Sequence, residues 1–149
     1  GDIVLQEGKP VYIGRATAPS ELFEILELDH FCLTTAQPEA MVSFYRLLGL
    51  KVRKEGERYE IEFPHFKINL HVIGYRILPE AKVAVPGTGD FCLEIKTGSD
   101  LSEIAEAFRR LDIFVEGPVI RHGRKGEMTS VYLRDPDQNL VELAVYPKQ

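Results

Sequence analysis

Two stretches of the chain, residues 38–50 and 101–113, carry apolar residues at the three- and four-residue spacing of an amphipathic helix. Each follows a short apolar run of strand type and precedes three more such runs, which lie at 51–54, 59–63 and 67–73 and again at 114–120, 129–134 and 140–146. The pattern therefore predicts one strand, one helix and three strands, and then the same order again.

The repeat is visible in the residues as well, because His-Phe-Cys-Leu at 30–33 returns as Asp-Phe-Cys-Leu at 90–93. We therefore expect an α+β fold of two tandem βαβββ modules. Residues 20–28 have the pattern of a short helix outside the repeat. The expected boundaries are an N-terminal extension at 1–26 and a single domain at 27–149, made of module one at 27–74, a connector at 75–87 and module two at 88–146.

A turn is predicted between the last two strands, where the sequence reads Asp135-Pro136-Asp137-Gln138-Asn139. Proline presets one turn dihedral, while the aspartate and asparagine side chains accept hydrogen bonds from their own backbone and tolerate left-handed geometry. The segment is therefore expected to form a tight hairpin connection.

Single polar residues stand in the first and last apolar strands of each module. Alternation along a strand places His30 on the face opposite Phe31, and Asp90 takes the equivalent position in module two. The last strands carry His71 and Glu142 within apolar runs. The helices must cover the faces that carry Phe and Leu, so these polar side chains are expected on the opposite, concave face.

Two imidazoles and two carboxylates are donors that divalent Zn, Ni, Fe, Mn or Co accept. If Asp90 and Glu142 were buried together without a cation, they would repel each other and lose their hydration. We therefore predict a divalent metal site formed by His30, His71, Asp90 and Glu142. The alternative is that Asp90 opens a strand at the surface and that His71 and Glu142 lie on an exposed sheet edge.

Composition restricts the classes of function. The chain has 149 residues, 44% hydrophobic and 28% charged, which suffices for one core, and its net charge of −5 disfavours a nucleic-acid partner. There is no apolar run of the roughly 20 residues that cross a membrane and no signal-peptide pattern, so we expect a cytoplasmic protein. Cys32 and Cys92 lie in apolar runs and are expected as small core residues in a reducing compartment.

At these residues the sequence resembles the vicinal oxygen chelate superfamily, which includes glyoxalase I, bleomycin-resistance proteins and extradiol dioxygenases. The resemblance covers residues 27–146, through LDHFCLTT and FYRLLGLKV in module one and through KINLH, VPGTGDFCL, EGPV and SVYLRDPDQNLVEL in the later strands. Within the superfamily the sequence is most similar to the branch of glyoxalase-domain-containing protein 5 and bacterial virulence-associated relatives.

The resemblance implies that the two modules form a curved, partly open eight-stranded barrel around one metal, with ligands from the first and last strand of each module. His30 matches the first-strand ligand and Glu142 the last-strand carboxylate, which in glyoxalase I also moves a proton at the substrate carbon. His71 falls where glyoxalase I usually has Glu, and Asp90 where most members have His. The number of ligands and the preferred metal therefore stay open.

The function that the resemblance implies is a metal-dependent lyase or isomerase of the glyoxalase I type, acting on a small substrate that chelates the metal through two oxygens. An extradiol-type dioxygenase with His30, His71 and Glu142 as an iron site is one alternative. A bleomycin-resistance-like protein that binds a small molecule without turnover is the other. Relatives commonly form homodimers, so we expect a homodimer, with neither nucleic acid nor membrane as a partner.

Overall fold

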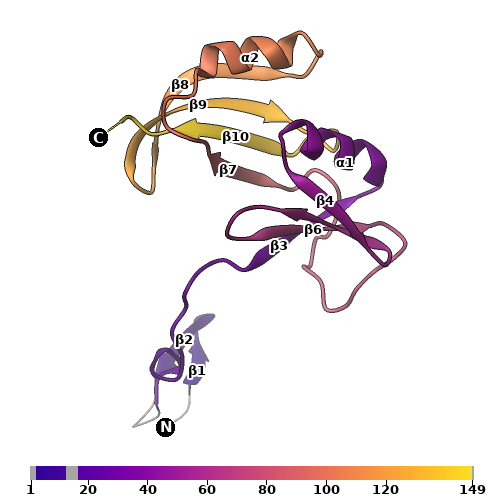
Figure 1. Cartoon of the computed structure of the whole chain (residues 1–149). Helices are drawn as coiled ribbons and strands as arrows, with labels where there is room; N and C mark the ends of the chain where they lie inside the picture. Colours follow the sequence, from indigo (N-terminus) through magenta and orange to yellow (C-terminus); the bar gives the residue numbers. More distant parts are fainter. Residues whose placement is uncertain (1–2, 13–16, 149) are drawn as a thin grey trace.

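The computed structural model describes residues 3–12 and 17–148 and contains two βαβββ modules preceded by a small N-terminal hairpin (Figure 1). The α+β class and the repeated element order predicted from the sequence are confirmed. Module one consists of β3 (His30–Thr35), α1 (Pro38–Leu47), β4 (Lys51–Glu55), β5 (Arg58–Glu62) and β6 (Lys67–Val72). Module two consists of β7 (Asp90–Glu94), α2 (Leu101–Arg109), β8 (Val115–Gly123), β9 (Gly126–Arg134) and β10 (Leu140–Val145).

Both helices end earlier than the apolar pattern predicts. Gly49 follows α1 with a φ of 87°, and Asp112 follows α2 with a φ of 57°, so in each case a left-handed residue turns the chain out of the helix. At the other end of α2 the Asp100 side chain accepts hydrogen bonds from the backbone N–H groups of Ser102 and Glu103. Local chain reversal therefore sets the helix lengths more tightly than hydrophobic spacing does.

Each module forms a four-stranded sheet, with the order β3-β6-β5-β4 in sheet 1 and β7-β10-β9-β8 in sheet 2. The first and last strands of a module, β3 with β6 and β7 with β10, pair in parallel, and the remaining neighbours are antiparallel. Among the described residues, strand pairing stays within each sheet, so the eight strands form a partly open arrangement and not a closed barrel.

The helices cover one face of each sheet, as the alternation predicted. In β3, Leu33 and Thr35 are buried while His30 and Cys32 are exposed. We call the face of each sheet opposite its helix the open face. The apolar residues on the helix sides of both sheets form one continuous core, whose fully buried members include Met41, Tyr45, Ile61, Ile68, Leu70, Val131, Leu133 and Val141.

The turn at 135–139 in module two makes hydrogen bonds to α1 of module one and to the residue before β7. Asp135 accepts hydrogen bonds from the backbone N–H groups of Asp137 and Asn139, which confirms the predicted turn, and it also accepts one from the Tyr45 hydroxyl of α1 at 2.7 Å. Asn139 in turn accepts a hydrogen bond from the Gly89 backbone N–H at 2.7 Å. A Cβ at Gly89 would lie 2.8 Å from both Asn139 Oδ1 and Leu33 Cδ2, so the approach requires glycine.

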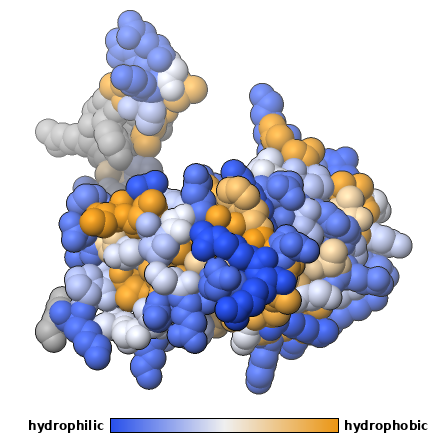
Figure 2. Space-filling model, turned by 90° about the horizontal axis from the view of Figure 1, so that it is seen from above, coloured by the Kyte–Doolittle hydropathy of each residue, from blue (hydrophilic) through white to orange (hydrophobic). Residues whose placement is uncertain are grey.

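The N-terminal part stands off from the two modules (Figures 1 and 2). Strands β1 (Ile3–Gln6) and β2 (Lys9–Tyr12) form a hairpin, and the 3-10 helix η1 (Pro19–Glu21) follows. The helix expected at 20–28 is wrong beyond η1, because residues 22–29 form no regular helix or strand. Among residues 3–12 and 17–148 their apolar side chains pack against no surface, and Leu22, Phe23, Ile25, Leu26 and Leu28 are 56–87% exposed. No helix among the described residues is long and apolar enough to cross a membrane.

Candidate functional site

The four predicted ligands lie on the two sheets in pairs, with His30 and His71 on sheet 1 and Asp90 and Glu142 on sheet 2. Within residues 3–12 and 17–148, no three His, Cys, Asp or Glu side chains come together as a metal-binding group. A single copy of the chain therefore does not assemble the predicted set, and the assignment of these four residues to a metal stays a prediction.

Strand register separates the members of each pair. His30 lies opposite Lys67 and His71 lies opposite Thr34, so the two histidines are four positions apart along neighbouring strands. On sheet 2, Glu142 lies opposite Cys92, which is two positions beyond Asp90. Along the strands, His71 is thus the member farthest from its first-strand partner.

Comparison of the two registers identifies a residue that the sequence analysis missed. Asn69 lies opposite Cys32 as Glu142 lies opposite Cys92, so Asn69 and not His71 is the structural counterpart of Glu142. Asn69 is 4% exposed, and both its Oδ1 and the Oε2 of Glu142 are buried without a hydrogen-bond partner among the described residues. The signal was present in the sequence, because Ile-Asn-Leu at 68–70 aligns with Val-Glu-Leu at 141–143.

The His30 ring lies within hydrogen-bond distance of a neighbouring carboxylate. Its Nδ1 lies 2.7 Å from Oδ1 of Asp29, which precedes it in the chain. A carboxylate that accepts the Nδ1 proton fixes the tautomer in which Nε2 carries the free lone pair. His30 therefore presents an available nitrogen on the open face of sheet 1.

Glu142 stands beside a protonated thiol. Desolvation and, secondly, the Glu142 carboxylate raise the pKa of Cys92 to about 11. The thiol therefore stays neutral near pH 7. Both cysteines are free and exposed and lie on the open faces, so their predicted place in the core is wrong. Alternation explains the difference, since the apolar neighbours of each cysteine point to the helix side.

The alternative interpretation placed His71 and Glu142 on an exposed sheet edge, and the strand order contradicts it. Strands β6 and β10, which carry His71 and Glu142, are inner strands of their sheets and not exposed edges. Asp90, in contrast, is exposed and opens β7, as that interpretation expected. A free Nε2 of His30 and a buried, unpartnered oxygen of Glu142 are donors suited to a borderline or hard divalent ion, so these residues fit a metal of the kind predicted.

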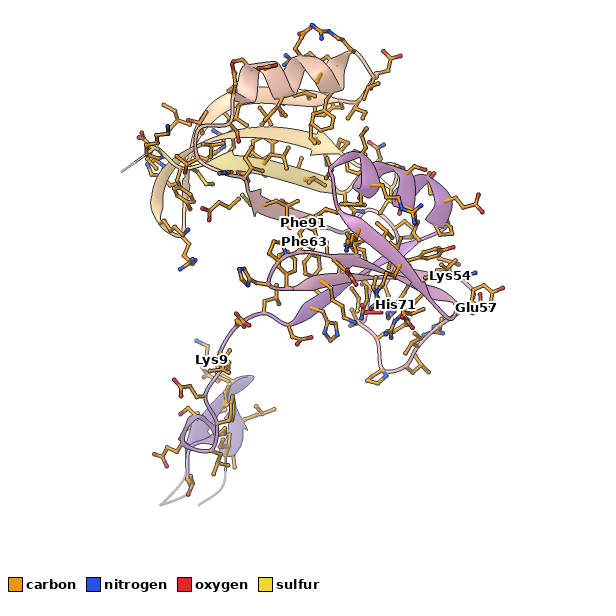
Figure 3. The ribbon with its side chains drawn as sticks, in the orientation of Figure 1. Lys9, Lys54, Glu57, Phe63, His71 and Phe91 are labelled. Carbon is orange, nitrogen blue, oxygen red and sulfur yellow. The ribbon has the colours of Figure 1, made fainter. Side chains whose placement is uncertain are left out.

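A cavity of about 840 Å³ lies where the connector passes over the open face of sheet 1. Cys32, Thr34 and His71 line it together with connector residues that include Arg76 and Glu80. His71 lies on the side of the sheet away from α1 (Figure 3). Burial, the Arg58 cation and His30 lower the pKa of His71, against an opposing effect of Glu80. The imidazole is therefore expected to be neutral near pH 7.

We expect His71 of the metal-free protein to titrate below the usual histidine range. The Arg58→Gln variant removes a cation that disfavours imidazolium, so it should raise the pKa of His71, whereas Arg110→Gln at the C-terminal end of α2 should leave it unchanged. NMR titration of the ring Cε1 protons measures both. An unaltered His71 pKa in Arg58→Gln would show that the two side chains do not interact.

Comparisons with known proteins agree with this architecture. The sequence profile described as the Glyoxalase/Bleomycin resistance protein/Dioxygenase superfamily matches residues 27–143. Glyoxalase domain-containing protein RDO1 of Mycosarcoma maydis is 39% identical over 127 residues, which are 82% of this chain and 69% of that protein. The solved structure VPC_CASS1 from the mobile metagenome of V. Pseudocholerae is 40% identical with a TM-score of 0.76, over 85% of this chain and 98% of its own.

The structure of lactoylglutathione lyase from Agrobacterium tumefaciens is similar at a TM-score of 0.61 and 25% identity, over 78% of this chain and 91% of that one. The profile match spans both modules, including His30, Asn69, His71, Asp90 and Glu142. The chain therefore belongs to the glyoxalase/bleomycin resistance protein/dioxygenase superfamily.

Proposed function

We propose that the protein is a divalent-metal-dependent lyase or isomerase that acts on a small substrate with two chelating oxygens. The observation that carries the proposal is the buried, unpartnered Oε2 of Glu142 on the open face of sheet 2. A buried carboxylate oxygen is costly unless a cation or a strong proton donor faces it, and the Cys92 thiol beside Glu142 is only a weak donor. Family membership and the similarity to a lactoylglutathione lyase support the same class of chemistry.

In this proposal His30 and Glu142 are the principal ligands, and Asn69, His71 and Asp90 are the further candidates. A bound divalent metal would act as a Lewis acid toward the substrate oxygens. Glu142 supplies the proton transfer at the substrate carbon, because a carboxylate with one free oxygen can accept a proton and return it. The neutral Cys92 thiol beside it adds no competing negative charge.

We propose further that two copies of the chain form the site. The open face of sheet 1 carries His30 and the open face of sheet 2 carries Glu142, and the described part of one chain brings no three His, Cys, Asp or Glu side chains together as a metal-binding group. A homodimer in which sheet 1 of one copy faces sheet 2 of the other brings both ligands to one place, and symmetry then produces two such sites.

A ring-cleaving dioxygenase is the weaker candidate. Such a site needs two histidines and one carboxylate on one side of an iron. The register places His71 four positions from His30, and the counterpart of Glu142 in module one is Asn69, which leaves one well-placed histidine.

Elemental analysis of untagged protein is the first test. Wild-type protein is expected to hold about one equivalent of nickel, zinc, cobalt or manganese per chain, and His30→Ala and Glu142→Gln should lose it, because each removes one principal ligand. Glu142→Gln keeps the shape of the side chain, so its circular dichroism and unfolding temperature should stay close to wild type. The His122→Ala variant, which alters a histidine on β8, should retain the metal.

Activity is tested by screening 2-oxoaldehydes and epimerisable acids with the metal-loaded protein. Turnover that disappears in Glu142→Gln supports the proposed base. Protein that neither contains metal nor takes it up on addition contradicts the proposal and leaves a binding protein. Asn69→Ala and His71→Ala decide the remaining ligand, and the strand register predicts the larger loss of metal affinity in Asn69→Ala.

A further inference from the structure

Arg58 is a cation that the proposed chemistry does not use. It begins β5 and lies directly opposite His71 on β6, so both side chains are on the open face of sheet 1. His71 lines the 840 Å³ cavity, and Arg58 is its direct neighbour on β5, although Arg58 is not among the residues that line the cavity.

The carboxylates around Arg58 are bound more closely by other cations. Glu60, which is 4% exposed, is hydrogen-bonded by Lys67 and lies 3.4 Å from Arg53. Arg53 also forms an ion pair at 3.1 Å with Glu55, which lies directly opposite Arg58 on the neighbouring strand β4. Beyond the sheet, the Glu80 carboxylate accepts a hydrogen bond from Arg76.

The Arg58 guanidinium has N–H groups without a hydrogen-bond acceptor among the described residues. Among the described residues its closest carboxylate approach is 3.9 Å, from Nη2 to Oε2 of Glu60, which exceeds hydrogen-bond distance. Its Nε is buried and has no hydrogen-bond partner in the part of the chain that the structure describes. A buried guanidinium N–H without an acceptor is rare in folded proteins unless a ligand supplies the acceptor.

We propose that Arg58 binds a carboxylate of the substrate, so that the substrate is a small oxygen-chelating acid. The proposal rests on the function proposed above, in which the chelating oxygens lie near His30 and Glu142. His71, opposite Arg58, is two residues beyond Asn69 along β6, roughly 7 Å, and four residues beyond the position opposite His30, roughly 13 Å. The long Arg58 side chain and a small acid together span that distance. One guanidinium whose nearest carboxylate, Glu60, lies 3.9 Å away and is hydrogen-bonded by Lys67 suits a single negative charge, and its planar fork matches a carboxylate.

Binding of matched acid and amide probes to metal-free protein tests the inference without turnover. Pyruvate and pyruvamide differ in the carboxylate, and inorganic phosphate serves as a second anion. Amide chemical-shift titrations give the dissociation constant of each probe. Wild-type protein is expected to bind pyruvate about tenfold or more tightly than pyruvamide, since a charge-assisted bidentate pair contributes at least that factor. Arg58→Gln should abolish the preference, and Arg58→Lys should retain part of it.

Arg53→Gln is the matched control, because Arg53 lies on the same face but is already paired with carboxylates. It should keep the wild-type preference. The inference is overturned if wild-type protein does not distinguish acid from amide or if Arg58→Gln still does. Phosphate that binds through Arg58 ten times more tightly than pyruvate would overturn the carboxylate assignment. Acid binding through Arg58 in protein that takes up no metal would refute the proposed function alone, and metal binding without acid preference would refute this inference alone.

Discussion

The Asp135→Ala variant is expected to lose about 3–4 kcal/mol of unfolding free energy, which corresponds to a fall of about 10 °C in the midpoint of thermal unfolding. Asp135 is 1% exposed and accepts four hydrogen bonds, from the Tyr45 hydroxyl, from two backbone N–H groups of the turn and from the Asn139 side chain. Alanine leaves these buried donors without an acceptor. Differential scanning calorimetry measures the effect.

Tyr45→Phe is the matched control for this prediction. It removes one of the four donors and leaves an apolar ring of nearly the same shape in the core, so we expect a smaller loss of about 1–2 kcal/mol. An Asp135→Ala protein that unfolds within about 2 °C of wild type would show that the turn does not fasten module two to α1.

Co-expression of His30→Ala with Glu142→Ala is expected to restore metal sites that neither variant has alone. In a heterodimer of the two, one site receives both substitutions and the other receives neither. Random pairing makes half of the dimers mixed, so metal content and turnover should return to about a quarter of the wild-type level. Metal analysis after tandem purification through two different tags, which are then removed, should show one site per mixed dimer.

Two further pairs of variants test whether recovery depends on which module each copy has lost. Glu142→Ala paired with Asn69→Ala places the two substitutions in different modules and should also recover one site per mixed dimer. His30→Ala paired with Asn69→Ala alters the same module in both copies and should recover none. If mixed dimers form but no metal site returns in His30→Ala with Glu142→Ala or in Glu142→Ala with Asn69→Ala, then each site forms within one chain or no dimeric site exists.

Much of the fold could be predicted because two kinds of periodicity coincided. The helical spacing around Met41 and Phe44, and the alternation around Phe31, recur in the second module, so each copy checks the other. The N-terminal residues have no second copy. The apolar pattern at 20–28 predicted a helix, but a short amphipathic helix whose apolar side chains stay exposed is not stable, and the chain forms no regular helix or strand beyond η1 there.

The candidate site could be predicted only in part. His30 and Glu142 stand in recognisable strands, and their open-face position follows from alternation. Asn69 was missed because the search favoured imidazole and carboxylate groups, although register pairs it with Cys32. Arg58 was missed because the sequence has many charged residues, and nothing in it distinguishes an arginine that lacks a close partner from one that is paired. Only the interatomic distances show that the neighbouring carboxylate of Glu60 is closer to Lys67 and Arg53 than to Arg58.

Phe31 and Phe91 hold the same position in the two modules, and their rings meet edge to face across the junction with centroids 5.4 Å apart (Figure 3 labels Phe91 between the sheets). A residue that touches its own counterpart is characteristic of an isologous interface, in which one surface is complementary to itself. A single free-standing module would have presented the same phenylalanine to a second module of its kind. In this chain the contact joins the two modules, whereas the opposite faces differ, with His30 in module one and Asp90 at the equivalent position of module two.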